Sequence, residues 1–129
     1  MHRLLLVVIL AAAAGATSAD PHTDYLLYCR GCHLHSGEAV PSADIPTLHQ
    51  LGPLLNSPEG REYIVRVPGV SQTPMSDKRL AAVLNWVITE FNKDSLPNNF
   101  KPYTIKEVRA ARHKVLVDPL KKRAEILKH

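Results

Sequence analysis

The residues with the clearest chemistry are Cys29, Cys32 and His33, which form the pattern C-x-x-C-H. In this pattern two thiols bond covalently to the vinyl groups of haem and the adjacent histidine ligates the iron. Two residues between the cysteines let one helical turn present both sulfurs to one edge of the porphyrin. A redox-active dithiol is the alternative, but it requires a strand-helix-strand context and gives the histidine no role. The motif therefore predicts one covalent haem c, held by Cys29 and Cys32 and ligated by His33.

The amino-terminal residues predict export. Arg3 supplies a charged start, residues 4–14 form an unbroken apolar run, and residues 17–19 are a small-residue cleavage site. An uncleaved membrane anchor is the alternative, but eleven apolar residues fall short of the roughly 20 needed to span a bilayer. We therefore expect a cleaved signal peptide over residues 1–19 and a soluble mature chain without a membrane span. Attachment of haem after export indicates a bacterial periplasm.

Charge divides the mature chain into two parts. Its length of about 110 residues fits one domain, to which a haem adds a large apolar body. Residues 20–100 contain six Lys and Arg against nine Asp and Glu, whereas residues 101–129 contain nine against three. The change falls at a turn-rich joint, residues 96–102. We therefore predict a haem module over residues 20–96 and a basic helical extension over residues 97–129.

The basic extension limits the kinds of partner. An exported protein rarely meets nucleic acid, so we expect none. The positive charge suits an acidic docking face on a periplasmic redox protein, or the acidic surface of the module itself. Amphipathic helices also need an apolar surface to pack on. We expect that surface to be the chain's own module, with a partner subunit as the alternative.

Helical periodicity runs through the mature chain, without the alternation that indicates strands. We expect a first helix from Pro21 or Thr23 into the haem motif, followed by a loop rich in Gly and Pro. Capping residues predict further helices that begin at Ser57-Pro58, at Ser76 or Asp77, after Thr104 in a capping box with Glu107, and at Asp118-Pro119.

Apolar residues at helical spacing predict which helix faces are buried. The longest stripe comprises Leu80, Val83, Leu84, Val87 and Phe91, widened by Trp86 and Ile88. The inner faces expected in the extension are Ile105, Val108, Ala111 and Val115 in its first helix and Leu120, Ala124 and Leu127 in its second.

From residue 25 to about residue 92 the chain resembles the class I cytochromes c, a family of small helical proteins with one covalent haem. The resemblance rests on the C-x-x-C-H motif, on G-E-A-V-P at residues 37–41, on I-P-T-L at residues 45–48 and on the helices opening at residues 58 and 76. It implies an all-α, cytochrome c-like fold. The first and last helices of the module would cross beside the haem, with Tyr25 or Leu26 against Trp86.

The resemblance also implies ligands beyond the motif. In the family a proline carbonyl accepts the Nδ1 proton of the ligating histidine; Pro46 matches that position best and Pro41 is the alternative. A methionine ahead of the last helix commonly binds the iron and raises its potential, which makes Met75 the candidate. The helix cap follows Met75 at once, whereas the family usually leaves several residues between them. Vacant or water-bound iron, or a ligand from His49 or His113, therefore remain as alternatives.

Nothing else in the sequence predicts an enzyme, because it has no phosphate-binding glycine loop, zinc-type spacing or acid-base constellation. The residues favour a periplasmic electron carrier between a dehydrogenase or reductase and another redox protein. One alternative is an open-site haem protein that binds a small ligand or reduces peroxide. Another is a fixed haem subunit of a periplasmic oxidoreductase, attached through the extension.

Overall fold

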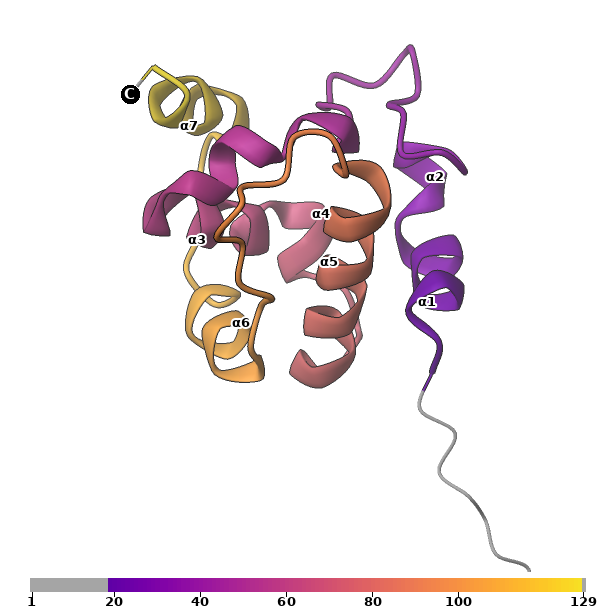
Figure 1. Ribbon diagram of the computed structural model, residues 1–129. Coiled ribbons are helices and arrows are strands. Elements are labelled where there is room, and N and C mark those ends of the chain that lie inside the picture. Colours follow the sequence, from indigo (N-terminus) through magenta and orange to yellow (C-terminus); the bar gives the residue numbers. More distant parts are fainter. Residues whose placement is uncertain (1–18, 129) are drawn as a thin grey trace, which may run out of the picture.

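The computed structural model describes residues 19–128, and within that range every regular element is a helix (Figure 1). The expected all-α architecture is confirmed. The expected signal peptide, residues 1–19, falls almost wholly outside the described residues, so its cleavage stays a prediction. None of the helices between residues 19 and 128 has the length and apolar character needed to cross a membrane.

The amino-terminal part of the fold presents the haem motif. Helix α1 (Pro21–Tyr28) begins at Asp20, whose carboxylate accepts a hydrogen bond from the Thr23 amide at 3.0 Å. The one-turn helix α2 (Arg30–His33) follows directly and carries the motif. The amide of His33 donates to the carbonyl of Cys29 at 3.0 Å, which closes this turn. Both cysteines and the histidine thus belong to a single helical turn, as their spacing predicts.

The segment expected to be a loop contains two short 3₁₀ helices, η1 (Leu48–Gln50) and η2 (Gly52–Asn56). The Thr47 hydroxyl caps η1, and Pro53 fits the first turn of η2. Gly60 brings η2 close to the next helix: a Cβ at that position would lie 2.0 Å from the carbonyl oxygen of Leu54. Only glycine permits this approach of the two backbones.

Three helices complete the module: α3 (Pro58–Arg66), α4 (Pro68–Ser71) and α5 (Asp77–Phe91). The hydroxyls of Ser57 and Ser76 cap α3 and α5, as predicted. Pro68 opens the single turn of α4, because proline suits the first position of a helix.

The crossing of α1 and α5 organises the core. The ring of Tyr25 lies 5.3 Å from that of Trp86 and 5.4 Å from that of Phe91, so the expected contact between the first and last module helices is confirmed. Along α5 the predicted stripe is buried, although Trp86 and Phe91 are only partly so. The buried members are Leu80, Val83, Leu84, Val87 and Ile88.

The extension packs on its own module. Helix α6 (Ile105–Ala111) lies against α3 and α5, and helix α7 (Pro119–Ile126) lies against α3, both away from α1 (Figure 1). Both predicted caps form, with the Thr104–Glu107 capping box on α6 and Asp118 on α7. Side chains of the extension enter the same hydrophobic core as those of the module: Tyr103, Val108, Ala111 and Ile126.

The predicted inner faces of the extension were partly wrong. Val108 and Ala111 are buried, but Val115 is 80% exposed because α6 ends at Ala111 and the helical spacing no longer applies. In α7 the core residue is Ile126, and this orientation leaves the predicted face outside the core. The remaining exposed members of the predicted faces are Ile105, Leu120, Ala124 and Leu127.

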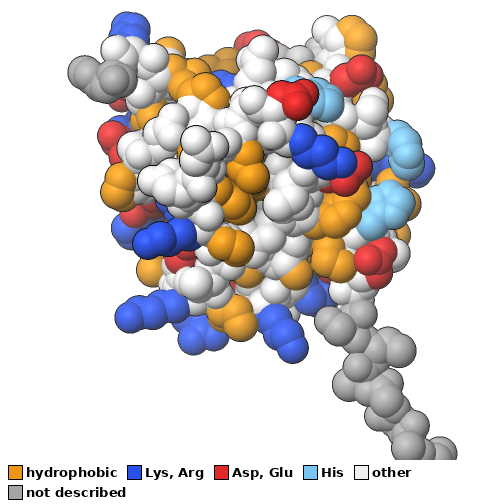
Figure 2. Space-filling model, in the orientation of Figure 1, with side chains coloured by type: hydrophobic (Ala, Val, Ile, Leu, Met, Phe, Trp, Pro, Cys, Tyr) orange, Lys and Arg blue, Asp and Glu red, His pale blue; other side chains and the backbone are white. Residues whose placement is uncertain are grey.

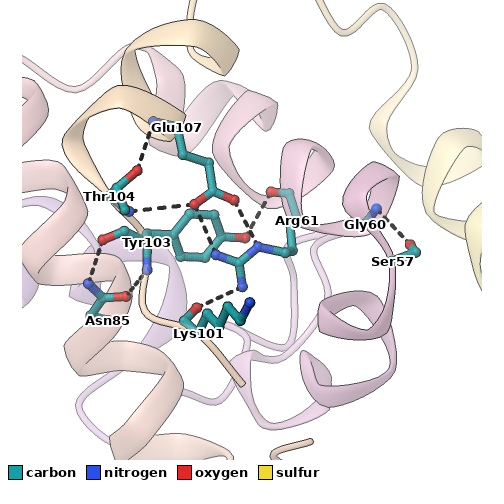
Figure 3. Close-up of polar contacts among 8 residues, drawn as sticks. All are labelled: Ser57, Gly60, Arg61, Asn85, Lys101, Tyr103, Thr104 and Glu107. Atoms are coloured by element: carbon teal, nitrogen blue, oxygen red, sulfur yellow. Dashed lines mark hydrogen bonds and ion pairs between the residues drawn. The ribbon is translucent and has the colours of Figure 1, made fainter. Parts of the chain in front are cut away.

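A polar cluster fastens α6 to α3 (Figure 3). Arg61 binds both carboxylate oxygens of Glu107, at 2.8 and 3.0 Å, and its guanidinium carbon lies 4.3 Å from the centre of the Tyr103 ring. The Tyr103 hydroxyl donates to the Arg61 carbonyl at 2.8 Å, and burial raises the pKa of this phenol. Asn85 bonds both the amide and the carbonyl of Tyr103. Bidentate pairing makes this the best-defined polar joint between the two parts of the chain.

Further ion pairs show which acidic surface the basic extension meets. Its lysines and arginines pair with carboxylates of α3 and α5, so the extension is neutralised in part by the acidic surface of its own module. These pairs are Lys114 with Glu62, Lys122 with Glu59, and Arg109 and Arg112 with Asp77.

Candidate haem site

The predicted site residues meet at one cavity of about 740 Å³, a size within the range of cofactor sites. The cavity is bounded by the haem motif, by the segment before η1, by α3, α4 and α5, and by the start of α7. All five predicted residues line it: Cys29, Cys32, His33, Pro46 and Met75. Residues separated by more than forty positions in the sequence thus face a common space.

The cavity suits a flat apolar group with thiol anchors at one edge. Much of its wall is aliphatic and belongs to the hydrophobic core, including Leu48, Leu51, Ile64, Val83, Leu84 and Val87. Cys32 is exposed, Cys29 is partly buried, and both are free thiols. Burial, with Asp24 and Cys32 nearby, raises the pKa of the Cys29 thiol to about 11. The site therefore combines the neutral thiol of Cys29 with an apolar wall.

His33 has the electrostatic state expected of a metal ligand. Burial lowers the pKa of its imidazole, which favours the neutral ring that binds iron. Its Nδ1 atom is buried and has no hydrogen-bond partner among residues 19–128. A buried ring nitrogen of this kind needs a partner, so the local chemistry fits a ring engaged by a metal on one side and a carbonyl on the other. We conclude that the residues present fit a haem group.

Pro46 lies on the wall of the same cavity, but its carbonyl makes no hydrogen bond with His33 Nδ1 among the described residues. Its role as the acceptor for that ring nitrogen therefore stays a prediction. Tyr25, to which the sequence assigned only packing, fixes the motif instead. Its buried hydroxyl donates to the carbonyls of His33, at 3.1 Å, and Leu34, at 2.6 Å. Burial raises the pKa of this phenol to about 12, so the donor stays protonated.

Met75 is 3% exposed and lies immediately before the Ser76 cap of α5. Its side chain belongs both to the hydrophobic core and to the cavity wall. The two histidines considered as alternatives do not line the cavity. His49 is exposed, packs edge-on against Phe91 at 5.5 Å between ring centres, and places Nδ1 3.2 Å from the Phe91 carbonyl. His113 is exposed as well.

The extension also reaches the cavity, which the sequence did not indicate. Residues 117–120, at the start of α7, line it together with Arg123. Arg123 donates to the Gln50 carbonyl at 3.2 Å. Burial raises the pKa of the neighbouring Tyr63 phenol, and Arg123 opposes that shift. No local signal predicts these contacts, because they arise only when α7 folds back over α3.

Comparison with known proteins adds two relatives, although no family model matches the chain. One is a cytochrome c-552 of Thermus thermophilus, with 30% identity over an alignment that is 134 positions long and covers 90% of each chain. The second is also a cytochrome c-552 of Thermus thermophilus, with 31% identity over 106 residues that cover 68% of this chain and 81% of that one.

Proposed function

The chain belongs to the cytochrome c-552 family of monohaem c-type cytochromes, and from this we propose that it carries single electrons between redox proteins in a bacterial periplasm. It is an electron carrier rather than an enzyme. The single observation that supports the proposal best is the convergence of the C-x-x-C-H turn and Met75 on one largely apolar cavity.

Each residue of the site has a distinct task in this proposal. When bound, the haem supplies the one-electron couple of its iron. Cys29 and Cys32 would hold it through thioether bonds, and the neutral imidazole of His33 would ligate the metal. We propose Met75 as the sixth ligand, whose soft sulfur favours ferrous iron, and the Pro46 carbonyl as the acceptor for His33 Nδ1. Tyr25 holds the backbone of the motif in place.

The apolar wall of the cavity affects how far water can reach the haem. Met75 belongs to the hydrophobic core, and the aliphatic wall of the cavity would limit the access of water to a bound haem. Cys32 is exposed and lines the cavity, so the edge of a haem bound to it would lie near solvent. We propose this edge as the place of electron entry and exit.

A redox titration of the purified holoprotein tests the function. We expect one reversible one-electron couple, and no carbon monoxide binding by the ferrous protein at short times, because His33 and Met75 would both ligate the iron. Rapid carbon monoxide binding by the wild type would instead favour the open-site haem protein. Acid-acetone extraction checks the attachment: the haem should stay with the protein, and a colourless pellet would contradict a covalent link.

Export remains part of the proposal, and cell fractionation of the tagged full-length chain tests it. We expect haem-containing protein in the periplasmic fraction, shortened by the residues before Asp20. The fixed-subunit alternative has lost its main support, because the extension covers its own module.

A further inference from the structure

The extension reaches the segment that carries Met75 through one side chain, Arg112. Its Nη2 donates to the carbonyls of Thr73, at 2.8 Å, and Ser71, at 3.2 Å. Its Nη1 donates to the carbonyl of Met75 at 2.9 Å and to the carboxylate of Asp77 at 3.0 Å. The Arg112 side chain is only 10% exposed. One guanidinium thus binds four residues of a seven-residue stretch.

The bound stretch is the irregular connection between α4 and α5, where helical hydrogen bonds do not satisfy the backbone carbonyls. Arginine suits it because its planar group offers five donors in a fixed arrangement. Hydrogen bonds from a charged donor are also roughly twice as strong as neutral ones. Arg112 therefore supplies hydrogen bonds to backbone carbonyls that have no helical partner.

Other arginines at the contact between the module and the extension bind different groups. Arg66, on the module, binds the carbonyls of Lys114 and Val115 in the extension. Arg109 pairs with Asp77 at 2.9 Å but binds none of the carbonyls that Arg112 binds, and its side chain is 69% exposed. If Arg112 only attached the extension to the module, it would not need to bind the carbonyls of Ser71, Thr73 and Met75 together.

We propose that Arg112 is a positioning residue for the sixth iron ligand: from the extension it fixes residues 71–77 so that the Met75 sulfur stays directed at the haem iron. The inference rests on the proposed role of Met75 as ligand. The backbone of Met75 is held by Arg112 on one side and by the Ser76 cap on the other, so only side-chain rotation remains free. The extension then helps to determine the ligation of the haem iron and its midpoint potential.

The test uses full-length holoprotein with Arg112→Gln, which keeps a polar side chain but removes the fork of charged donors. Arg109→Gln is the matched control, because it removes a neighbouring guanidinium that shares Asp77. Three signals are measured: the red-edge charge-transfer band of the ferric protein, the midpoint potential, and the rate of carbon monoxide binding by the ferrous protein.

Loss of a charge-assisted hydrogen bond is expected to raise the open fraction of the segment about tenfold. Carbon monoxide should therefore bind Arg112→Gln about tenfold faster than the wild type, since only molecules with the methionine displaced can react. The charge-transfer band should weaken and the potential should fall. Arg112→Lys should recover part of each signal, because an ammonium reaches fewer carbonyls, and Arg109→Gln should match the wild type.

The inference is overturned if Arg112→Gln, or Arg112→Lys where the former does not accumulate, lowers only the melting temperature and leaves all three signals unchanged. Met75→Ala separates this failure from failure of the ligand assignment. If Met75→Ala keeps the wild-type spectrum, methionine is not the ligand and both ideas fall. If it loses the band while the Arg112 variants keep it, Met75 is a ligand that Arg112 does not position.

Discussion

Met75 is the residue that decides between an electron carrier and an open haem. Its thioether is a soft ligand that stabilises ferrous iron, whereas an empty position would admit small molecules. Its near-complete burial is compatible with two roles, because a methionine at the start of α5 also packs against the core. Substitution separates the roles, since ligation changes a spectrum and packing changes only stability.

We predict that Met75→Ala abolishes the red-edge charge-transfer band, opens the ferrous iron to carbon monoxide and lowers the midpoint potential. Absorption spectroscopy and potentiometry measure these effects. A variant that loses about 2–5 kcal/mol of stability, as expected for a cavity in the core, and keeps the wild-type spectrum would assign Met75 to packing alone.

At the scale of elements, α6 and α7 form an integral part of the fold. They and the segment before them supply four buried side chains to the core and face α3 and α5 with paired charges. The joint predicted near residue 97 therefore separates two kinds of surface charge, while the hydrophobic core continues across it. Stability and the haem site should both depend on the extension.

A chain that ends after Asn99 should melt at a markedly lower temperature than the full-length protein. Truncation uncovers the apolar faces of α3 and α5, and each large side chain lost from the core costs about 2–5 kcal/mol. Thermal unfolding followed by circular dichroism measures the change. Lys106→Ala in the full-length chain is the control, because this exposed side chain should contribute little. An unchanged melting temperature after truncation would contradict self-packing.

The ion pair between Lys114 and Glu62 links the extension to α3 and predicts that the stability of the fold depends on pH. Lys114, assisted by Arg66, lowers the pKa of the Glu62 carboxyl. An unpaired glutamate titrates near about pH 4.3. Because the folded value is lower, the unfolded chain binds more protons around this pH, so the pair stabilises the fold above about pH 4 and loses its effect as the pH falls further.

Glu62→Gln should therefore reduce stability at pH 7 by about 1 kcal/mol or less, the range for partly exposed pairs. The difference from the wild type should shrink as the pH falls below the unfolded pKa of about 4.3, because the native carboxyl, whose pKa is lower, then becomes protonated as well. Urea unfolding at several pH values measures it. Glu38→Gln, at an exposed position without an ion pair among residues 19–128, should show no such convergence.

For the whole molecule, the distribution of basic side chains bears on docking. Figure 2 shows Lys and Arg gathered over α6 and the neighbouring start of α5. Several of them are already paired with carboxylates of the module. Lys121 differs, because it is exposed on α7, the helix of the extension that borders the haem cavity. An acidic partner that approaches the α7 side of the cavity would meet this exposed charge.

Lys121→Glu should slow electron exchange with an acidic redox partner at low ionic strength. The difference from the wild type should shrink toward 1 M salt, where the screening length is only about 3 Å. Stopped-flow kinetics measures the rate. Lys106→Glu is the control with the same charge change on α6, which does not border the cavity, and it should have the smaller effect. A rate indifferent to salt and to Lys121→Glu would exclude electrostatic docking through α7.

Local patterns in the sequence determined much of this molecule. The C-x-x-C-H motif places three functional groups within one helical turn, so its interpretation needs no distant contact. Capping residues and apolar spacing fixed the starts of α3, α5, α6 and α7, because a helix end depends on hydrogen bonds within its first turn. The contact of Tyr25 with Trp86 had a different source, because the resemblance to the class I cytochromes c implied that Tyr25 or Leu26 would meet Trp86.

Contacts between distant segments were decided only by the tertiary structure. Arg112 reads in the sequence as one more charge in a basic tail, and Tyr25 as one more apolar residue, yet both bind backbone carbonyls near the site. The prediction of the inner face of α7 was wrong for the same reason. Spacing shows which residues share a face of a helix, but packing on α3 selects the face that is buried. Long-range hydrogen bonds and helix orientation depend on the whole fold, which no local pattern records.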